Sequence, residues 1–226
     1  MYGFGKLILL MITSGFVVVA LQRSFFKKSD EGNSDYSLDS RYVPALDDEE
    51  QRHLNKPMPL DPFPSLRSAF KTSGADVIAL YFAASWCPMS TPITNLLDDL
   101  FRDKLVSASN SDKRFAIVYV SSDKDSATFD AYVKPGWKTV PYANKEERSA
   151  IKHHFRTCAK REMEEVGLAT RDYEIPNLIV LAGKSQQVLT YAGIQDVKEL
   201  GDAAVDHWME LKRLQTALET KVDVTS

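Results

Sequence analysis

The sequence predicts an α/β fold with three layers, in which helices cover both faces of a central mixed sheet. Two apolar runs, residues 77–83 and 115–120, are rich in aromatic and β-branched residues, and each is followed by a segment with helical spacing. Two shorter runs, 177–181 and 188–191, flank a glycine-containing turn and predict a hairpin. Together these segments predict the order β-α-β-α-α-β-β-α for the folded domain.

The helix after the first strand is expected to run from Cys87 to about residue 105. Pro92 falls inside its second turn, where the missing N–H should kink the helix. The apolar residues that recur at helical spacing, and should face inward, are Leu96, Leu97, Leu100, Phe101 and Leu105.

Three later helices follow from the same kind of spacing. The first is expected at 123–133, with Asp125 or Ser126 as its cap. The second is expected at 146–166 and carries Cys158 on its apolar side. We expect Cys158 to be a buried, inert thiol, the alternative being a distant resolving cysteine. The third helix is expected at 197–211, and its inward residues should be Leu200, Ala204, Trp208 and Leu211.

A strongly apolar, uncharged run occupies residues 7–21. At 1.5 Å per residue it extends about 22 Å, and residues 1–5, with Lys6 reaching to the interface, bring it close to a bilayer core of about 30 Å. We therefore expect residues 1–28 to form a hydrophobic signal-anchor helix. Three basic residues follow the run and one precedes it, which would place the domain in the cytosol. The alternative is a cleaved signal peptide, with secretion or residence in the ER lumen.

The rest of the chain divides by composition. Residues 29–57 are polar and acidic and predict a flexible linker. The folded domain is expected at 58–212, followed by a polar tail at 213–226.

The overall composition excludes some classes of function. The chain has 226 residues, a net charge of −3 and no evident basic face, which argues against nucleic-acid binding. Its two cysteines do not form a disulfide framework, and they suit a reducing compartment better than a secreted scaffold.

Cys87 is the candidate nucleophile. It follows the first strand at the expected start of a helix, where free N–H groups and the positive end of the helix dipole favour a thiolate. Ser90 lies one turn later and could donate a hydrogen bond to that thiolate or cap the helix. Pro88 suits the first helical position, and Trp86 either shields the sulfur or belongs to the core. The alternative is a small buried cysteine without a role.

Four segments resemble, in order, the nucleoredoxin and tryparedoxin branch of the thioredoxin superfamily. They are 81–88, which ends Ser-Trp-Cys-Pro, and 115–123, 136–142 and 175–181. The resemblance covers roughly residues 55–212. It implies a thioredoxin-like fold, exchange with protein disulfide or thiol substrates, and no cofactor or metal.

The same resemblance implies a cis-proline at Pro176, after Ile175, beside the reactive cysteine. The backbone there would pair with an extended substrate segment. It also makes the segment 159–174 longer than expected, so that this segment could shape a partner surface beside the site.

The chain departs from the family at the second cysteine. The family carries Cys-Pro-Pro-Cys, whereas this chain has Cys87-Pro88-Met89-Ser90, a CxxS motif. A hydroxyl cannot displace a disulfide sulfur, so the dithiol cycle cannot close within the motif. Three hypotheses follow: a monothiol oxidoreductase resolved by an outside thiol such as glutathione, a module that captures thiols without turnover, and a redox-silent protein-binding scaffold.

Overall fold

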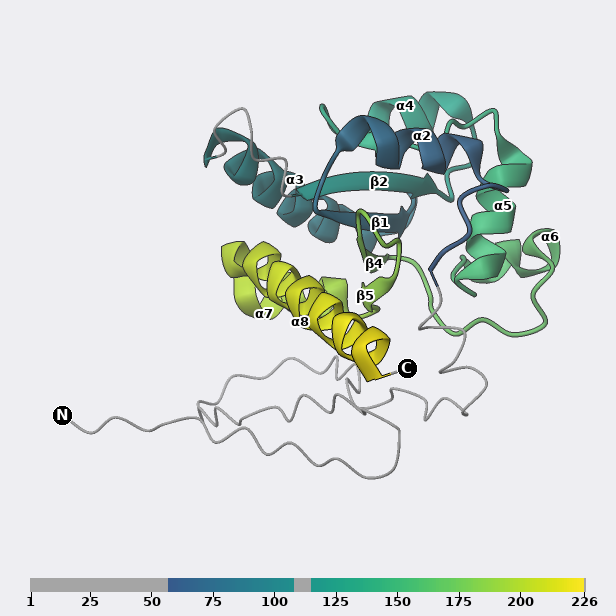
Figure 1. Cartoon of the computed structure of the whole chain (residues 1–226). Coiled ribbons are helices and arrows are strands. Elements are labelled where there is room, and N and C mark those ends of the chain that lie inside the picture. The colour runs from purple at the N-terminus through teal and green to yellow at the C-terminus, as the bar shows by residue number, and fades with distance from the viewer. Residues whose placement is uncertain (1–56, 108–114, 226) are drawn as a thin grey trace, which may run out of the picture. The chain divides into compact units, whose positions relative to one another are not determined.

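A computed structural model describes residues 57–107 and 115–225 of the chain (Figure 1). The predicted signal-anchor segment and all but the last residue of the predicted linker lie outside these residues. Within the described residues, no helix is both long enough and apolar enough to cross a bilayer.

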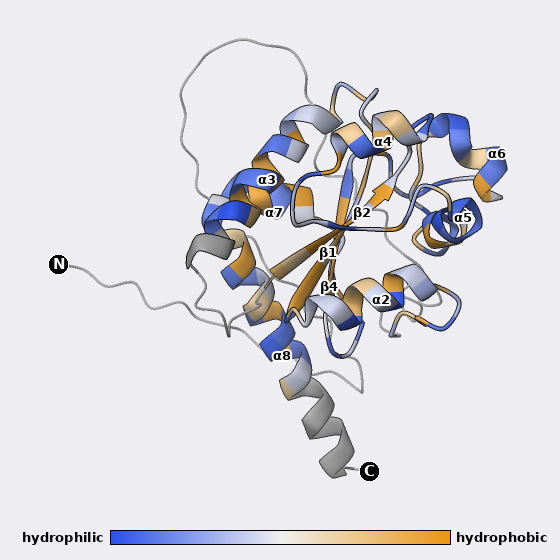
Figure 2. Cartoon of the chain, turned by 90° about the horizontal axis from the view of Figure 1, so that it is seen from above, coloured by the Kyte–Doolittle hydropathy of each residue, from blue (hydrophilic) through white to orange (hydrophobic). Residues whose placement is uncertain are grey.

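A five-stranded mixed sheet forms the centre of the fold. The sequence predicts a mixed sheet, but only four of its five strands, because the strand at residues 138–139 is too short to give a pattern. The strands are β1 (Val77–Ala83), β2 (Phe115–Ser121), β3 (Lys138–Thr139), β4 (Asn177–Ala182) and β5 (Val188–Thr190), in the spatial order β3-β2-β1-β4-β5. β1 is parallel to β2 and antiparallel to β4, and β5 closes the predicted hairpin with β4. Every residue of β1, β2 and β4 is buried, which explains why these strands are uninterrupted apolar runs (Figure 2).

Helices cover both faces of this sheet. They are α2 (Pro64–Ser73), α3 (Ser90–Ser107), α4 (Ser126–Tyr132), α5 (Lys145–His154), η1 (Lys160–Glu162), α6 (Met163–Val166), α7 (Gly193–Leu200), η2 (Gly201–Ala203) and α8 (Ala204–Thr225). Alternate side chains of β1 enter two separate cores. Ile78, Leu80 and Phe82 pack with α2 and α5, whereas Val77, Ala79 and Tyr81 pack with α3, α7 and α8.

The carboxylate of Glu147 on α5 caps α2 from a distance. Phe63 stands at the N-cap of α2 and offers no capping side chain. Glu147 Oε1 instead accepts hydrogen bonds from the N–H groups of Ser65, at 2.7 Å, and Leu66, at 3.1 Å. Two N–H groups that the helix leaves free are thereby satisfied, and α2 is tied to α5.

The start of α3 corrects the sequence prediction. The helix begins at Ser90, not at Cys87. Pro92 therefore lies in the first turn, where its missing N–H has no intrahelical partner, so the reason for the predicted kink disappears. Leu97 is fully buried as expected, but Leu96 is exposed. Asp125 caps α4, as predicted, and accepts the N–H of Thr128.

The prediction of a single helix at 146–166 is wrong. The helix α5 ends at His154, and the chain turns away at Arg156. This residue adopts a left-handed conformation, with φ of 48°. Its N–H bonds His153 O, and the N–H of Thr157 bonds Lys152 O. These two bonds form a Schellman ending, for which the sequence gives no glycine signal. Thr157 then pairs with Tyr173, so the segment between them, with η1 and α6, returns to where it began.

The last predicted helix is also interrupted. Gly201, with φ of 54°, separates α7 from α8. Ala204 and Trp208 are fully buried, as predicted, but Leu200 is exposed. α8 continues to Thr225, well beyond residue 211.

Candidate active site

Cys87 lies on a tight turn between β1 and α3. Its N–H bonds Ala84 O at 3.1 Å, and its carbonyl accepts the N–H of Ser90 at 2.9 Å. Cys87 precedes the first residue of α3 by three positions and is 7% exposed. Its neighbours Pro88 and Met89 are exposed, so this turn lies at the surface of the domain. The thiol is free.

The strand register brings Cys87 to the Ile175–Pro176 bond. Phe82, near the end of β1, is paired with Asn177, the first residue of antiparallel β4. The residues after β1 therefore meet the residues before β4. The sulfur of Cys87 lies 4.0 Å from Ile175 O, and the Ile175–Pro176 peptide bond is cis, as the resemblance implies.

Ser90 is fully buried below this turn. In the described part of the chain, its hydroxyl bonds the N–H of Ala84 at 3.5 Å and not the sulfur of Cys87. Its carbonyl accepts hydrogen bonds from the hydroxyls of Tyr81, at 3.1 Å, and Thr94, at 2.9 Å. Ser90 therefore helps to hold the turn against α3.

Tyrosine side chains extend this hydroxyl cluster. The Thr94 hydroxyl also bonds those of Tyr81, at 2.9 Å, and Tyr132, at 2.5 Å. Burial raises the pKa of Tyr81 and the pKa of Tyr132 above their ordinary values. Both phenols thus stay neutral at physiological pH and serve as hydrogen-bond donors.

Asp123 holds the start of the loop that carries Cys87, a role that sequence analysis missed. The register pairs Ala83 with Ser121, so the loop after β1 lies beside the loop after β2. One carboxylate oxygen of Asp123 accepts the N–H of Ser85 at 2.6 Å. The other accepts the hydroxyls of Tyr119, at 2.6 Å, and Ser121, at 2.7 Å. Polar residues at the carboxyl ends of adjacent parallel strands were the signal that could have found this cluster.

Trp86 is fixed at the surface. Its indole N–H donates to Ser122 O at 2.8 Å, and 37% of the residue is exposed, so it is not part of the core. The guanidinium carbon of Arg161 lies 4.1 Å from the ring centre, and Arg161 Nη2 donates to the same carbonyl at 3.0 Å. The segment 159–174, which sequence analysis found to be longer than expected, thus places the cation of Arg161 beside the turn that carries Cys87.

Glu162 anchors that segment. Its carboxylate pairs with Lys152 of α5 at 2.7 Å and accepts the Ser122 hydroxyl at 2.6 Å. It also accepts the N–H of Ala159 at 3.1 Å. Cys158 lies next to this ion pair and is fully buried, as predicted, and burial raises the pKa of its thiol.

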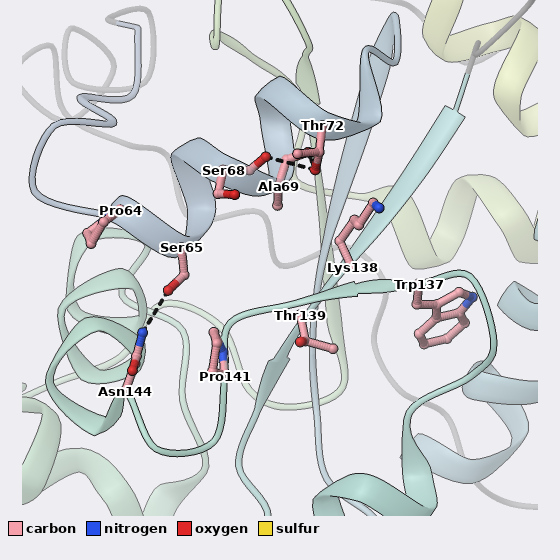
Figure 3. Close-up of a pocket in the computed structure, with 10 residues that line it drawn as sticks. All are labelled: Pro64, Ser65, Ser68, Ala69, Thr72, Trp137, Lys138, Thr139, Pro141 and Asn144. Atoms are coloured by element: carbon pink, nitrogen blue, oxygen red, sulfur yellow. Dashed lines mark hydrogen bonds between the residues drawn. The ribbon is translucent and has the colours of Figure 1, made fainter.

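A cleft of about 540 Å³ lies between α2 and the β3 edge of the sheet. Its lining includes Trp137 and Lys138, from one of the segments that carry the resemblance (Figure 3). The amide of Asn144 donates to the Ser65 hydroxyl at 2.7 Å at one end. None of the predicted site residues lines this cleft.

Comparisons with known proteins show to which family the chain belongs. The model of a family described as thioredoxin-like matches residues 74–188. Nucleoredoxin of Xenopus laevis is 26% identical over 124 residues, which are 54% of this chain and 25% of that protein. Tryparedoxin of Trypanosoma brucei brucei is 31% identical over 81 residues, which are 35% of this chain and 51% of that protein.

Solved structures of tryparedoxins are also similar. The Trypanosoma brucei tryparedoxin structure has 24% sequence identity and a TM-score of 0.47, with 62% of this chain and 83% of that chain covered. The chain spans a quarter of the Xenopus nucleoredoxin and about half of the Trypanosoma tryparedoxin sequence. Because the family model covers half of the chain, the chain belongs to the thioredoxin-like family.

Proposed function

We propose that this thioredoxin-like chain is a monothiol oxidoreductase in which Cys87 exchanges disulfides with thiol or disulfide substrates. The observation that carries the proposal is the distance of 4.0 Å between the sulfur of Cys87 and Ile175 O. Cys87 lies on a surface turn that follows β1. A substrate segment bound along Ile175 and Pro176 would bring its disulfide to this sulfur. Trp86 and Pro88 would border the same segment.

The chemistry needs two steps and an outside thiol. The Cys87 thiolate attacks one sulfur of a substrate disulfide, a mixed disulfide forms at Cys87, and the other sulfur leaves as a thiolate. Ser90 has a hydroxyl in the resolving position and cannot complete the cycle. A second thiolate, such as that of glutathione, then attacks the substrate sulfur of the mixed disulfide, forms a new disulfide with it and releases the Cys87 thiolate.

Mass spectrometry of the full chain with glutathione disulfide tests the first step. We expect a single glutathione adduct on Cys87, no adduct in Cys87→Ser, and an unchanged adduct in Cys158→Ser, because Cys158 is fully buried. Absence of any adduct on the folded protein would contradict a reactive Cys87 and leave a redox-silent scaffold.

Turnover separates catalysis from capture. With excess glutathione and a glutathionylated protein substrate, we expect many substrate molecules to be reduced per Cys87. Formation of one stable adduct per chain, without further turnover, would instead identify a thiol-capturing module on the same scaffold. Trapping of mixed disulfides through Cys87 in cells would then identify the protein substrates.

We also propose that residues 7–21 anchor the chain in a membrane, with the domain at 58–212 in the cytosol. The support is the uncharged apolar run and the excess of basic residues after it. In intact microsomes, protease should digest the domain. Protection of the domain would favour the alternative, a cleaved signal peptide and a lumenal or secreted chain.

A further inference from the structure

A second cleft lies beside the reactive turn. It has a volume of about 560 Å³, within the range of small-molecule sites. Three parts of the chain line it: the end of β2 with the loop after it, α5 with the two residues 142 and 143 before it, and η1 with α6. Two lining residues also touch the loop before Cys87, because Asp123 binds the N–H of Ser85 and Arg161 stacks on Trp86. We call this space the Lys124 cleft.

Positive charge exceeds negative charge in the Lys124 cleft. Five basic and three acidic side chains line it. Two of the basic side chains have carboxylate partners: Lys152 pairs with Glu162 at 2.7 Å, and Lys145 pairs with Glu165 at 3.3 Å. The third carboxylate, that of Asp123, accepts hydrogen bonds from the neutral donors described above and forms no ion pair within the described residues. The difference, five minus three, leaves two positive charges.

The remaining basic residues are Lys124, Arg148 and Arg161, and within the described residues none of them forms an ion pair. Arg148 is only 8% exposed. Its Nη1 donates to Pro141 O at 3.0 Å and to Tyr142 O, and its guanidinium lies 4.5 Å from the ring centre of Tyr142. Carbonyl groups and aromatic rings thus fix two guanidinium groups without neutralising them. Arg161 is exposed, whereas Arg148 is buried, and a bound anion would offset the cost of holding the Arg148 charge out of water.

We propose that the Lys124 cleft binds the carboxylates of a small acidic thiol of the glutathione class and directs its sulfur to Cys87. This inference rests on the proposed monothiol function and names the molecule that supplies the second thiol. Guanidinium groups match carboxylates in geometry, and the indole of Trp86 connects the cleft to the reactive turn. The thiolate of the bound molecule attacks the glutathione sulfur of the Cys87 mixed disulfide, glutathione disulfide is released, and Cys87 returns as a thiolate.

Calorimetry of the full chain with S-methylglutathione tests the binding separately from the chemistry, since this probe has no free thiol. We expect its dimethyl ester, which lacks both carboxylates, to bind at least about tenfold more weakly. Lys124→Glu should weaken binding of S-methylglutathione by about tenfold, because an exposed cation becomes an anion within the cleft. The control is Lys198→Glu, which makes the same charge change at an exposed position of α7 and should alter binding by less than about twofold.

Equal affinities for the acid and the ester, or equal effects of Lys124→Glu and Lys198→Glu, would overturn the proposal. Binding of an acidic peptide without binding of S-methylglutathione would also overturn it. The rate at which Cys87 reacts with the uncharged hydroxyethyl disulfide tests the proposed function by itself. If Cys87 reacts with both reagents but does not prefer glutathione disulfide, the proposed role of the Lys124 cleft is refuted. The proposed monothiol function is then left intact.

Arg161→Gln provides a second variant. It keeps a polar side chain over Trp86 but removes the charge, so the preference of Cys87 for glutathione disulfide over hydroxyethyl disulfide should fall severalfold. An unchanged ratio in the folded variant would contradict a role for Arg161 in binding the acidic thiol.

Discussion

The carboxylate of Asp123 accepts the main-chain N–H of Ser85 at 2.6 Å, and this bond joins the ends of two parallel strands two residues before Cys87. The two loops are neighbours because Ala83 pairs with Ser121 in the sheet. The bond fixes the start of the turn that carries Cys87, and Asp123 therefore acts as a positioning residue that does not touch the sulfur.

Replacement of Asp123 by asparagine should disturb this turn. An amide presents one oxygen to three donors, and its NH₂ group must face at least one of them. We expect a loss of about 1–3 kcal/mol in the free energy of unfolding, measured with urea, and a changed rate of Cys87 alkylation. Asp125→Asn is the control, because asparagine is as good an N-cap for α4 as aspartate. Equal effects of the two substitutions would contradict a special role for Asp123.

Replacement of Ser90 by cysteine should restore a dithiol site. Residue 90 follows Cys87 by three positions, where the resemblance in sequence implies the family's second cysteine, and a thiol there could displace a substrate from the proposed mixed disulfide. We expect disulfide reduction driven by dithiothreitol to rise well above that of the unaltered chain, at a cost of about 1–3 kcal/mol for the larger atom in a fully buried position.

Thr91→Cys adds a thiol at the next, exposed position and serves as the control for Ser90→Cys. It should not increase turnover. A folded Ser90→Cys protein that reduces disulfides no faster than Thr91→Cys would show that the turn is not competent for exchange.

Replacement of Glu162 by glutamine should leave the buried Lys152 ammonium without a carboxylate. Only 4% of the Lys152 side chain is exposed. Removal of one partner of such a pair costs about 3–5 kcal/mol. Glu165→Gln is the control, since the Lys145–Glu165 pair is at least half exposed and should be worth no more than about 1 kcal/mol.

The Glu162→Gln variant should also gain stability as the pH rises. Burial lowers the pKa of Lys152, and the nearby Glu162 carboxylate opposes this shift. Without the carboxylate the pKa falls further, so the unfolded chain binds more protons than the folded one below the ordinary lysine pKa. Unfolding free energy then increases with pH between the lowered pKa of Lys152 and the ordinary lysine pKa. A flat profile for the variant would indicate that water reaches the Lys152 ammonium.

The left-handed backbone at Arg156 can be tested with two small residues. Alanine and glycine both remove the side chain, so their difference reports the backbone alone. We expect Arg156→Gly to be more stable than Arg156→Ala by about 1 kcal/mol, measured by thermal unfolding. At Ser149, inside α5, the order should reverse, because glycine is the poorer helix former. The same order at both positions would contradict the Schellman ending.

The parts of the fold that the sequence predicts correctly are those with strong local signals. β1, β2 and β4 are buried on both faces and therefore have nearly continuous apolar sequences. The meeting of Cys87 with the Ile175–Pro176 bond was implied by the resemblance to the family and not by local spacing. The start of α3 was misplaced because Pro88 suits the second position of the Cys87–Ser90 turn as well as the first position of a helix. The end of α5 was missed because an arginine, and not a glycine, adopts the left-handed conformation.

The residues around Cys87 were harder to predict for a different reason. Asp123 binds the N–H of Ser85 from 38 positions further along the chain, and Arg161, which stacks on Trp86, is more distant still. Their roles depend on strand register and on the path of the chain after α5. Asp123 has one weak signal, its place after the second strand, whereas Arg161 belongs to no pattern that marks a binding residue in the sequence.

Because Thr157 pairs with Tyr173, the segment between them could be replaced without moving the rest of the domain. It enters and leaves the domain through adjacent residues, and the cost of closing such a segment grows only slowly with its length. Related chains can therefore lengthen, shorten or replace it while the sheet and the thiol stay in place. Selectivity for a co-substrate would then evolve independently of reactivity.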